Sequence, residues 1–214
     1  MTEIFIDNTL PCVFSERTDI RSDVWKKELK LERGKKYLIE AESGSGKTSL
    51  CSFLIGQRSD YLGRICFDKT DIRQFKPTDW ADIRCRHISS VFQEMRIFAE
   101  LSGWENVVIK NNLTKHKTES EILDWFQRLG LGNHTTHLAG KMSLGQQQRI
   151  ALMRSLTQPF DFIIADEPVS HLDEENAIIM AELMKEEAEK NNAGIIVTSI
   201  GKRLPLDYDY ILKL

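Results

Sequence analysis

Residues 41 to 50, AESGSGKTSL, combine the residue types that bind the phosphate groups of a nucleotide. The stretch follows the pattern G-x-x-x-x-G-K-[ST], except that Ala41 stands at the first glycine. In such a P-loop the backbone N–H groups surround the β-phosphate, Lys47 reaches the β- and γ-phosphates, and the Thr48 hydroxyl binds Mg²⁺. The change at Ala41 is harmless if that residue has a negative φ. The predicted phosphate-binding residues are Ser43, Gly44, Ser45, Gly46, Lys47, Thr48 and Ser49.

The segments on either side of the P-loop supply the context that it needs. YLIE, residues 37 to 40, is typical of a strand, and TSLCSFLIG, residues 48 to 56, places its apolar residues on one helical face. A Gly/Ser turn that carries Lys-Thr by coincidence is the alternative interpretation. The order of strand, loop and helix favours the P-loop.

A pair of carboxylates follows an apolar run in FDFIIADEP, residues 160 to 168. Asp166 and Glu167 stand at the end of this predicted strand, where Pro168 stops its continuation. Asp166 is suited to hold Mg²⁺ through water, and Glu167 to polarise the water that attacks the γ-phosphate. The alternative is a strand followed by an acidic turn without a catalytic role.

MSLGQQQRIALMRSL, residues 142 to 156, places a Ser and a Gly before a predicted helix. The dipole and the free N–H groups at the N-terminus of such a helix can face an anion. The stretch therefore predicts a second surface suited to phosphate.

These motifs lie among short apolar stretches that we interpret as strands, and amphipathic helical patterns separate the stretches. Such alternation predicts an α/β fold with a largely parallel sheet that is covered on both faces. The predicted strands are residues 37–40, 64–67, 88–92, 161–166 and 194–200.

Three regions read as helical. Residues 118 to 130 carry a Thr or Ser cap, early acids, an apolar stripe and a terminal glycine. From about 94 to 142 there is no strand pattern, so we expect a helical lobe inserted between strands. Residues 174 to 190 predict a covering helix whose acids face water.

The composition is typical of a globular protein, with 41% hydrophobic and 29% charged residues in a chain of 214. A net charge of −3 without a basic run gives nucleic-acid binding little support. We expect a cytosolic protein, because no apolar run approaches the ~20 residues that span a bilayer and the N-terminus lacks a signal-peptide pattern. The four widely spaced cysteines favour free, mostly buried thiols over disulfides or zinc ligands.

MSLGQ, residues 142 to 146, resembles the L-S-G-G-Q signature of the ATP-binding cassette (ABC) ATPases. Other landmarks of that family follow in the family's order. VFQE, residues 91 to 94, resembles the Q-loop, IADEP the Walker B motif, and SHLD, residues 170 to 173, the D-loop. The ordered set covers nearly the whole chain and is far more specific than any one motif. Within the family, the chain looks most like the small lipoprotein-release, macrolide-export and cell-division cassettes.

The resemblance implies one ABC nucleotide-binding domain over residues 1–214, with the α/β fold of P-loop NTPases. A RecA-like core, about 1–93 and 157–214, would hold a mostly parallel central sheet and an antiparallel β portion near the N-terminus. A helical subdomain would occupy about 94–156. The implied cofactors are ATP and Mg²⁺. The implied partners are a membrane-spanning permease, which would hold the chain at the inner face of the membrane, and a second identical or different cassette.

The resemblance also implies roles for single residues. Cassettes of this family close head to tail, so Ser143 and Gly145 would act on the nucleotide of the partner cassette. Phe14 would stack on adenine, although an ordinary core aromatic is the alternative. The further nucleotide-binding residues are Gln146 and Asp173, the metal ligands are Thr48, Gln93 and Asp166, and the catalytic residues are Glu167, Gln93 and Ser199.

Two departures from the family pattern bear on activity. Leu144 replaces a signature glycine and adds a bulky side chain near the expected dimer face. Ser199 stands where the family usually has a His that contacts the γ-phosphate. Because its hydroxyl is shorter and neutral, we expect slow hydrolysis; losing one such contact costs on the order of 3 kcal/mol, about a hundredfold in rate.

The resemblance therefore implies the ATP-hydrolysing subunit of an ABC transporter, which energises a separate membrane subunit through ATP-driven dimerisation of cassettes. The alternative is a slowly hydrolysing, ATP-dependent switch or scaffold that regulates a membrane complex. A small-molecule kinase is disfavoured, because it leaves MSLGQ and SHLD unexplained. A DNA-clamp protein is disfavoured, because it needs long coiled-coil insertions.

Overall fold

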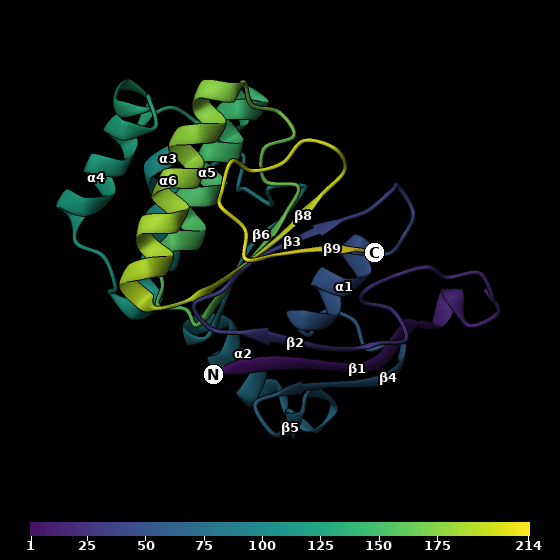
Figure 1. Ribbon diagram of the computed structural model, residues 1–214. Helices are drawn as coiled ribbons and strands as arrows, with labels where there is room; N and C mark the ends of the chain where they lie inside the picture. Colours follow the sequence, from purple (N-terminus) through teal and green to yellow (C-terminus); the bar gives the residue numbers. More distant parts are fainter.

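The computed structural model describes residues 1–214 and contains two sheets with helices between and beside them (Figure 1). The larger sheet has five parallel strands in the order β6-β7-β8-β3-β9. Its inner strands β7 and β8 are buried along their whole length. The strands are β3 (Lys36–Glu40), β6 (Ile88–Val91), β7 (Phe162–Asp166), β8 (Gly194–Ser199) and β9 (Tyr210–Lys213).

Both faces of the parallel sheet are covered, as the sequence predicts. Side chains alternate between two hydrophobic clusters, so that Ile163 and Ile195 join one cluster while Ile164 and Ile196 join the other. The first cluster packs against helices α3 to α6, and the second against α1 and the smaller sheet. This arrangement leaves the carboxyl ends of the parallel strands at one edge, where the loops that carry chemistry emerge.

The smaller sheet is antiparallel, with the strand order β2-β1-β4-β5. It corrects one prediction, because residues 64–67 belong to β4 of this sheet instead of the parallel sheet. The middle of β4 is solvent-exposed at Leu62 to Arg64, whereas an inner parallel strand would be buried on both faces. The strands are β1 (Glu3–Pro11), β2 (Glu28–Glu32), β4 (Tyr61–Phe67) and β5 (Thr70–Asp71).

Most of the α-helices gather on one side of the parallel sheet (Figure 1). Helix α1 lies between the two sheets, and α3 to α6 gather at one end of the molecule. The α-helices are α1 (Lys47–Leu54), α2 (Pro77–Arg86), α3 (Gly103–Thr114), α4 (Glu119–Arg128), α5 (Leu144–Leu156) and α6 (Glu174–Asn191). The 3-10 helices are η1 (Cys12–Phe14), η2 (Ile72–Gln74), η3 (Gly132–His134) and η4 (Ala139–Lys141).

Helix α4 confirms the helix predicted over residues 118 to 130. Thr118 is its N-cap and forms a capping box with Glu121, and Gly130 follows the helix with a φ of 66°. The region from 94 to 142 contains helices and loops but no strand, also as predicted. None of the helices combines the length and the apolar character needed to span a lipid bilayer.

Helix α6 covers the sheet as predicted, but one of its acids does not face water. Glu187 is fully buried, and its carboxylate lies 2.6 Å from the Lys117 ammonium and 2.7 Å from that of Lys190. The reason is helical spacing: Glu187 follows Leu183 by four residues and so lies on the same inward face. A buried carboxylate of this kind needs its cationic partners.

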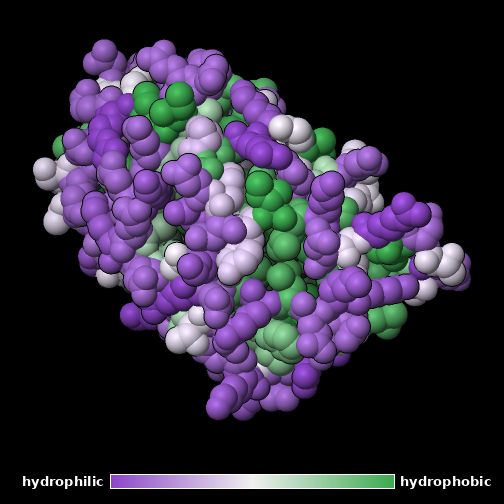
Figure 2. All heavy atoms as spheres, viewed as in Figure 1, coloured by the Kyte–Doolittle hydropathy of each residue, from purple (hydrophilic) through white to green (hydrophobic).

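The surface is polar over most of the face shown in Figure 2. An apolar band crosses it between the helices and the antiparallel sheet. The edge strand β9 contributes an exposed apolar side chain, Ile211. The four cysteines are free thiols; Cys51 and Cys66 are buried, Cys85 is partly buried and Cys12 is exposed.

Candidate functional site

The P-loop connects the end of β3 to the start of α1, as the sequence predicts. Gly44 has a φ of 78° and Gly46 a φ of 100°, conformations that side chains with a Cβ rarely adopt. Ala41 is not among the residues with positive φ, so its Cβ is tolerated. Its amide donates to the carbonyl of Ser199 at 3.2 Å, which joins the start of the P-loop to the end of β8.

Two aromatic residues pack against the P-loop. A Cβ on Gly46 would lie 3.0 Å from Cε2 of Phe14 and 3.1 Å from Cζ2 of Trp25, so both rings touch the glycine directly. The Trp25 indole donates to the Ser45 carbonyl at 2.9 Å. No motif in the sequence marks Trp25, and the only signal for its role is that a buried indole N–H needs an acceptor.

Phe14 lies beside the P-loop, where the prediction of an adenine-stacking residue requires it. The ring is 7% exposed and lines a surface depression together with Arg17, Trp25 and Ser45. The Arg17 guanidinium lies 4.3 Å from the ring centroid and covers one face of it. A base that stacks on this face must therefore displace Arg17.

The two carboxylates at the end of β7 have different surroundings. Asp166 is 5% exposed and accepts a hydrogen bond from the Thr198 hydroxyl on the neighbouring strand. Glu167 has a φ of 48°, which is uncommon for a residue with a side chain. Its carboxylate lies 3.6 Å from the ammonium of Lys47, which is 5% exposed. The fold thus brings the P-loop lysine and the predicted general base together.

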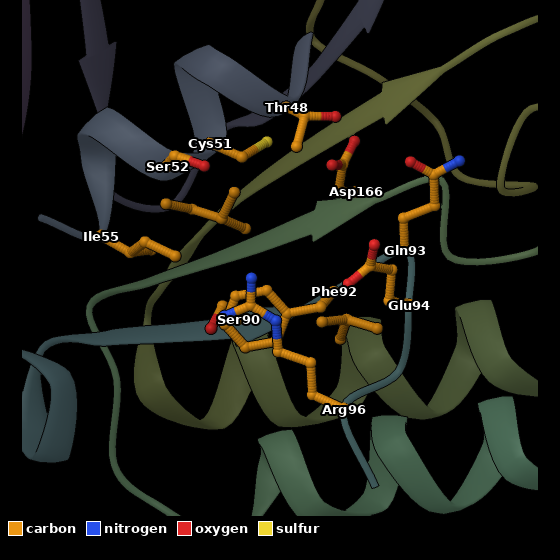
Figure 3. A pocket seen from close by; sticks show the side chains of 12 residues that line it. Thr48, Cys51, Ser52, Ile55, Ser90, Phe92, Gln93, Glu94, Arg96 and Asp166 are labelled. Carbon is orange, nitrogen blue, oxygen red and sulfur yellow. The ribbon is translucent and has the colours of Figure 1, made fainter. Parts of the chain in front are cut away.

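Thr48, Gln93 and Asp166 line one cavity of about 100 Å³ and point into the same space (Figure 3). Their hydroxyl, amide and carboxylate oxygens are ligands that Mg²⁺ prefers. No group of three or more His, Cys, Asp or Glu side chains in the chain is suited to hold a metal ion. Because Mg²⁺ prefers octahedral coordination and these three side chains would fill only part of it, a magnesium ion held here would take its further ligands from phosphate oxygens and water.

Cys51 lies on the same cavity, one helical turn after Thr48. Burial, followed by the nearby charge of Asp166, raises the pKa of its thiol well above the ordinary value. The thiol is therefore held neutral and is a poor nucleophile or metal ligand.

The signature residues lie at the N-terminus of α5. Ser143 is the N-cap, and its backbone amide donates to Oε1 of Gln146 at 2.9 Å in a capping box. A Cβ on Gly145 would lie 3.1 Å from the carbonyl of His171, so the absence of a side chain lets the D-loop approach the helix closely. Leu144 is 52% exposed, pointing outward from this surface.

Ser143, Gly145 and Asp173 line a second depression, which shares no residue with the cavity that Thr48, Gln93 and Asp166 line. The predicted site residues thus form two groups: one around the P-loop and the ends of β7 and β8, and one at the N-termini of α5 and α6.

Gln148 connects the two groups and was not singled out from the sequence. It is 1% exposed, and its Nε2 donates to the carbonyl of Glu167 at 3.3 Å while its Oε1 accepts from the amide of His171 at 3.2 Å. Helix α5 therefore holds the segment from residue 167 to residue 173, which we call the 167–173 segment.

Ser199 ends β8 and is 1% exposed. Its hydroxyl donates to the carbonyl of Lys202 at 2.6 Å, within the turn that follows the strand. The side chain predicted to contact the γ-phosphate is thus hydrogen-bonded within its own turn.

Comparison with known proteins finds relatives that are ATP-binding proteins of ABC transporters. Residues 26–170 match the sequence model of the family described as ABC transporter. The chain is 32% identical to the ABC transporter ATP-binding protein YtrE of Bacillus subtilis over 195 residues, which cover 86% of this chain and 84% of YtrE. It is 28% identical to the lipoprotein-releasing system ATP-binding protein LolD of Syntrophotalea carbinolica, over 94% of this chain and 88% of LolD.

Solved structures share the fold. A dimeric, post-hydrolysis structure of the ATP-binding cassette MJ0796 with ADP and Pi superposes with a TM-score of 0.75 at 22% identity, covering 92% of this chain and 87% of that one. A second dimeric structure of the same cassette gives a TM-score of 0.76 at 23% identity, with the same coverage.

Proposed function

The chain belongs to the ABC transporter family as an ATP-binding subunit, and on this premise we propose how its residues bind and hydrolyse ATP. The observation that carries the proposal is the meeting of Lys47, Glu167 and Asp166 at the carboxyl edge of the parallel sheet. In this scheme the P-loop amides and Lys47 hold the β- and γ-phosphates, and Phe14 stacks on adenine once Arg17 moves aside.

Glu167 is the general base of the proposed reaction. Its carboxylate would take a proton from the attacking water, and its ion pair with Lys47 at 3.6 Å supports a position near the γ-phosphate. When a phosphate group binds the Lys47 ammonium, it would replace Glu167 as the partner of that ammonium. The Glu167 carboxylate would then be free to accept the proton from water. The backbone of Glu167 is left-handed, with a φ of 48°, and its carboxylate lies 3.6 Å from the Lys47 ammonium.

Thr48, Asp166 and Gln93 are the proposed magnesium ligands. The bound ion would neutralise charge on the β- and γ-phosphate oxygens. Asp166 is held in place by the Thr198 hydroxyl, and Gln93 reaches the same cavity from the end of β6.

A second cassette completes each site in this proposal. Ser143, Gly145 and Asp173 line a surface depression that is not part of the chain's own P-loop, which suits contact with the nucleotide of a partner cassette. Gln146 is proposed to join them from the first turn of α5, where it forms the capping box with Ser143. The dimeric form of the MJ0796 structures supports this arrangement.

The proposed energy acceptor is a membrane-spanning permease, which membership of the ABC transporter family supports. In the proposal the cassette sits at the cytoplasmic face of the membrane, and the helical region of about 94–156 receives the permease.

The rate of hydrolysis separates a transport motor from a slow switch. The hydrogen bond from Ser199 to Lys202 favours the slow alternative, because a hydroxyl held in this way is not directed at a γ-phosphate. Turnover that is fast and rises with transport would exclude the switch.

The test of the general base is Glu167→Gln in the complex with the permease. ATP turnover should fall by about a hundredfold or more, because general-base catalysis contributes on that scale. ATP affinity should persist, because the P-loop is unchanged. Glu182→Gln, an exposed acid on α6, is the matched control and should hydrolyse ATP at the parent rate. A Glu167→Gln complex as fast as the parent would show that the assignment is wrong.

A further inference from the structure

The turn after β8 is tied to the 167–173 segment by a single lysine. Gly201 has a φ of 82° and reverses the chain, and the Ser199 hydroxyl donates to the Lys202 carbonyl at 2.6 Å. The Lys202 ammonium extends in the opposite direction and donates to the carbonyl of Leu172. Lys202 therefore binds Ser199 with its backbone and the D-loop with its side chain.

The contact lies at the end of a segment whose start carries the general base. The amide of Glu167 donates to the carbonyl of Thr198 at 3.1 Å, and Gln148 holds the middle of the segment. Lys202 is the third attachment, one residue before Asp173 caps α6. Two of the three attachments come from β8 and the turn that follows it.

Glu167 depends on such attachments. With a φ of 48° its backbone lies in a sparsely populated region, and such a conformation persists only where the surroundings determine it.

The side chain of Lys202 also adds positive charge near Asp173. The pKa of the Asp173 carboxyl is lowered, first by hydrogen bonds from the backbone and side-chain amides of Asn176 and further by the charges of Arg149 and Lys202.

We propose that Lys202 is a positioning residue for ATP hydrolysis, which couples the end of β8 to the segment that carries Glu167. This inference rests on the proposed function of Glu167. Ser199 does not reach out of its turn, and Lys202 reaches from the other end of the same turn to the D-loop. The structure therefore assigns to Lys202 the connection between the carboxyl end of β8, next to the P-loop, and the D-loop.

The experiment compares Lys202→Met, which keeps the stem but removes the ammonium, with Lys202→Arg in the permease complex. Lys202→Met should lower kcat about ten- to a hundredfold, the cost of a small misplacement at a reacting centre. KM for ATP should not change, because the P-loop contacts remain. Lys202→Arg should restore most of kcat, because its guanidinium can still donate to Leu172.

Arg203→Met is the matched control, since it removes the neighbouring cation, which pairs with Glu40 at 2.7 Å and makes no contact with the D-loop. Its kcat should stay within about threefold of the parent, the scale of a surface ion pair. A parent-like kcat for Lys202→Met would overturn the inference. So would a loss of ATP affinity without loss of ADP affinity by calorimetry, which would make Lys202 a γ-phosphate ligand instead.

A second measurement does not need turnover. Amide hydrogen exchange of the 167–173 segment should be faster in Lys202→Met than in the parent, with thermal unfolding verifying that both are folded. Equal exchange would overturn the inference. If the parent complex hydrolyses no ATP, the proposed function fails, and hydrogen exchange alone decides whether Lys202 holds the segment.

Discussion

Two glycines of the P-loop offer a matched pair of alanine substitutions that separates backbone strain from side-chain crowding. Gly44 and Gly46 both have positive φ, at 78° and 100°. A Cβ on Gly44 would meet nothing within 4 Å, whereas one on Gly46 would meet Phe14 at 3.0 Å and Trp25 at 3.1 Å. Both substitutions therefore carry the cost of a positive φ, but only Gly46→Ala also carries the cost of crowding against the aromatic rings.

The expected magnitudes follow from these contacts. Gly44→Ala should lower the free energy of unfolding by about 1–2 kcal/mol, the cost of a left-handed conformation for a residue with a Cβ. Gly46→Ala should add about 1–3 kcal/mol of overpacking, for a total of about 2–5 kcal/mol. The rings cannot move freely, because the Trp25 indole is hydrogen-bonded to the Ser45 carbonyl and Phe14 is buried.

The assay is urea unfolding of the nucleotide-free chain, followed by tryptophan fluorescence. In a Phe14→Ala background the extra cost of Gly46→Ala should shrink, because one of the two contacts is gone. Equal losses for Gly44→Ala and Gly46→Ala, or an unchanged extra cost without Phe14, would refute the contact between the aromatic rings and the P-loop.

Two further predictions test other parts of the molecule. Glu187→Gln should destabilise the chain by about 3–5 kcal/mol, because it removes the buried carboxylate 2.6 Å from the Lys117 ammonium and leaves only the more exposed carboxylate of Glu121, at 3.5 Å. In the same urea titration the double variant Lys117→Met/Glu187→Met should recover most of that loss, and no recovery would contradict the argument. Ser199→His should raise ATP turnover, by up to about a hundredfold, because an imidazole reaches further toward the γ-phosphate than a hydroxyl bound to Lys202. A steady-state ATPase assay measures this, and turnover at or below the parent value would show that another group serves the position.

The parts of the fold that follow local rules could be predicted from the sequence. The P-loop lies between β3 and α1 because strand, glycine turn and helix are each specified within a few residues. Helix α4 begins at Thr118 because a capping box needs only residues three apart. Strand pairing is not local in this sense. Residues 64–67 show a strand pattern, but only pairing with β1, which lies far away in the sequence, assigns them to the antiparallel sheet.

The site residues that the sequence analysis missed act through long-range contacts. Trp25 reaches the carbonyl of a P-loop residue 20 positions away, and Lys202 reaches Leu172 across 30 positions. No short motif records such pairs. Glu187 is a different case, because its inward position follows from helical spacing, and the assumption that acids face water overrode that signal.

The structure also explains why the two most visible departures, Ala41 and Ser199, differ in consequence. They meet each other through the backbone, since the amide of Ala41 donates to the carbonyl of Ser199. A backbone hydrogen bond does not depend on either side chain, so the junction of β3 and β8 survives both changes. Ala41 loses nothing further, because its position does not require positive φ. At Ser199 the change removes a side chain that would reach beyond the turn. We therefore expect the change at Ser199 to act on the rate of hydrolysis. In the proposal made above for Lys202, its hydrogen bond to the Leu172 carbonyl is then the side-chain link from this turn to the segment that carries Glu167.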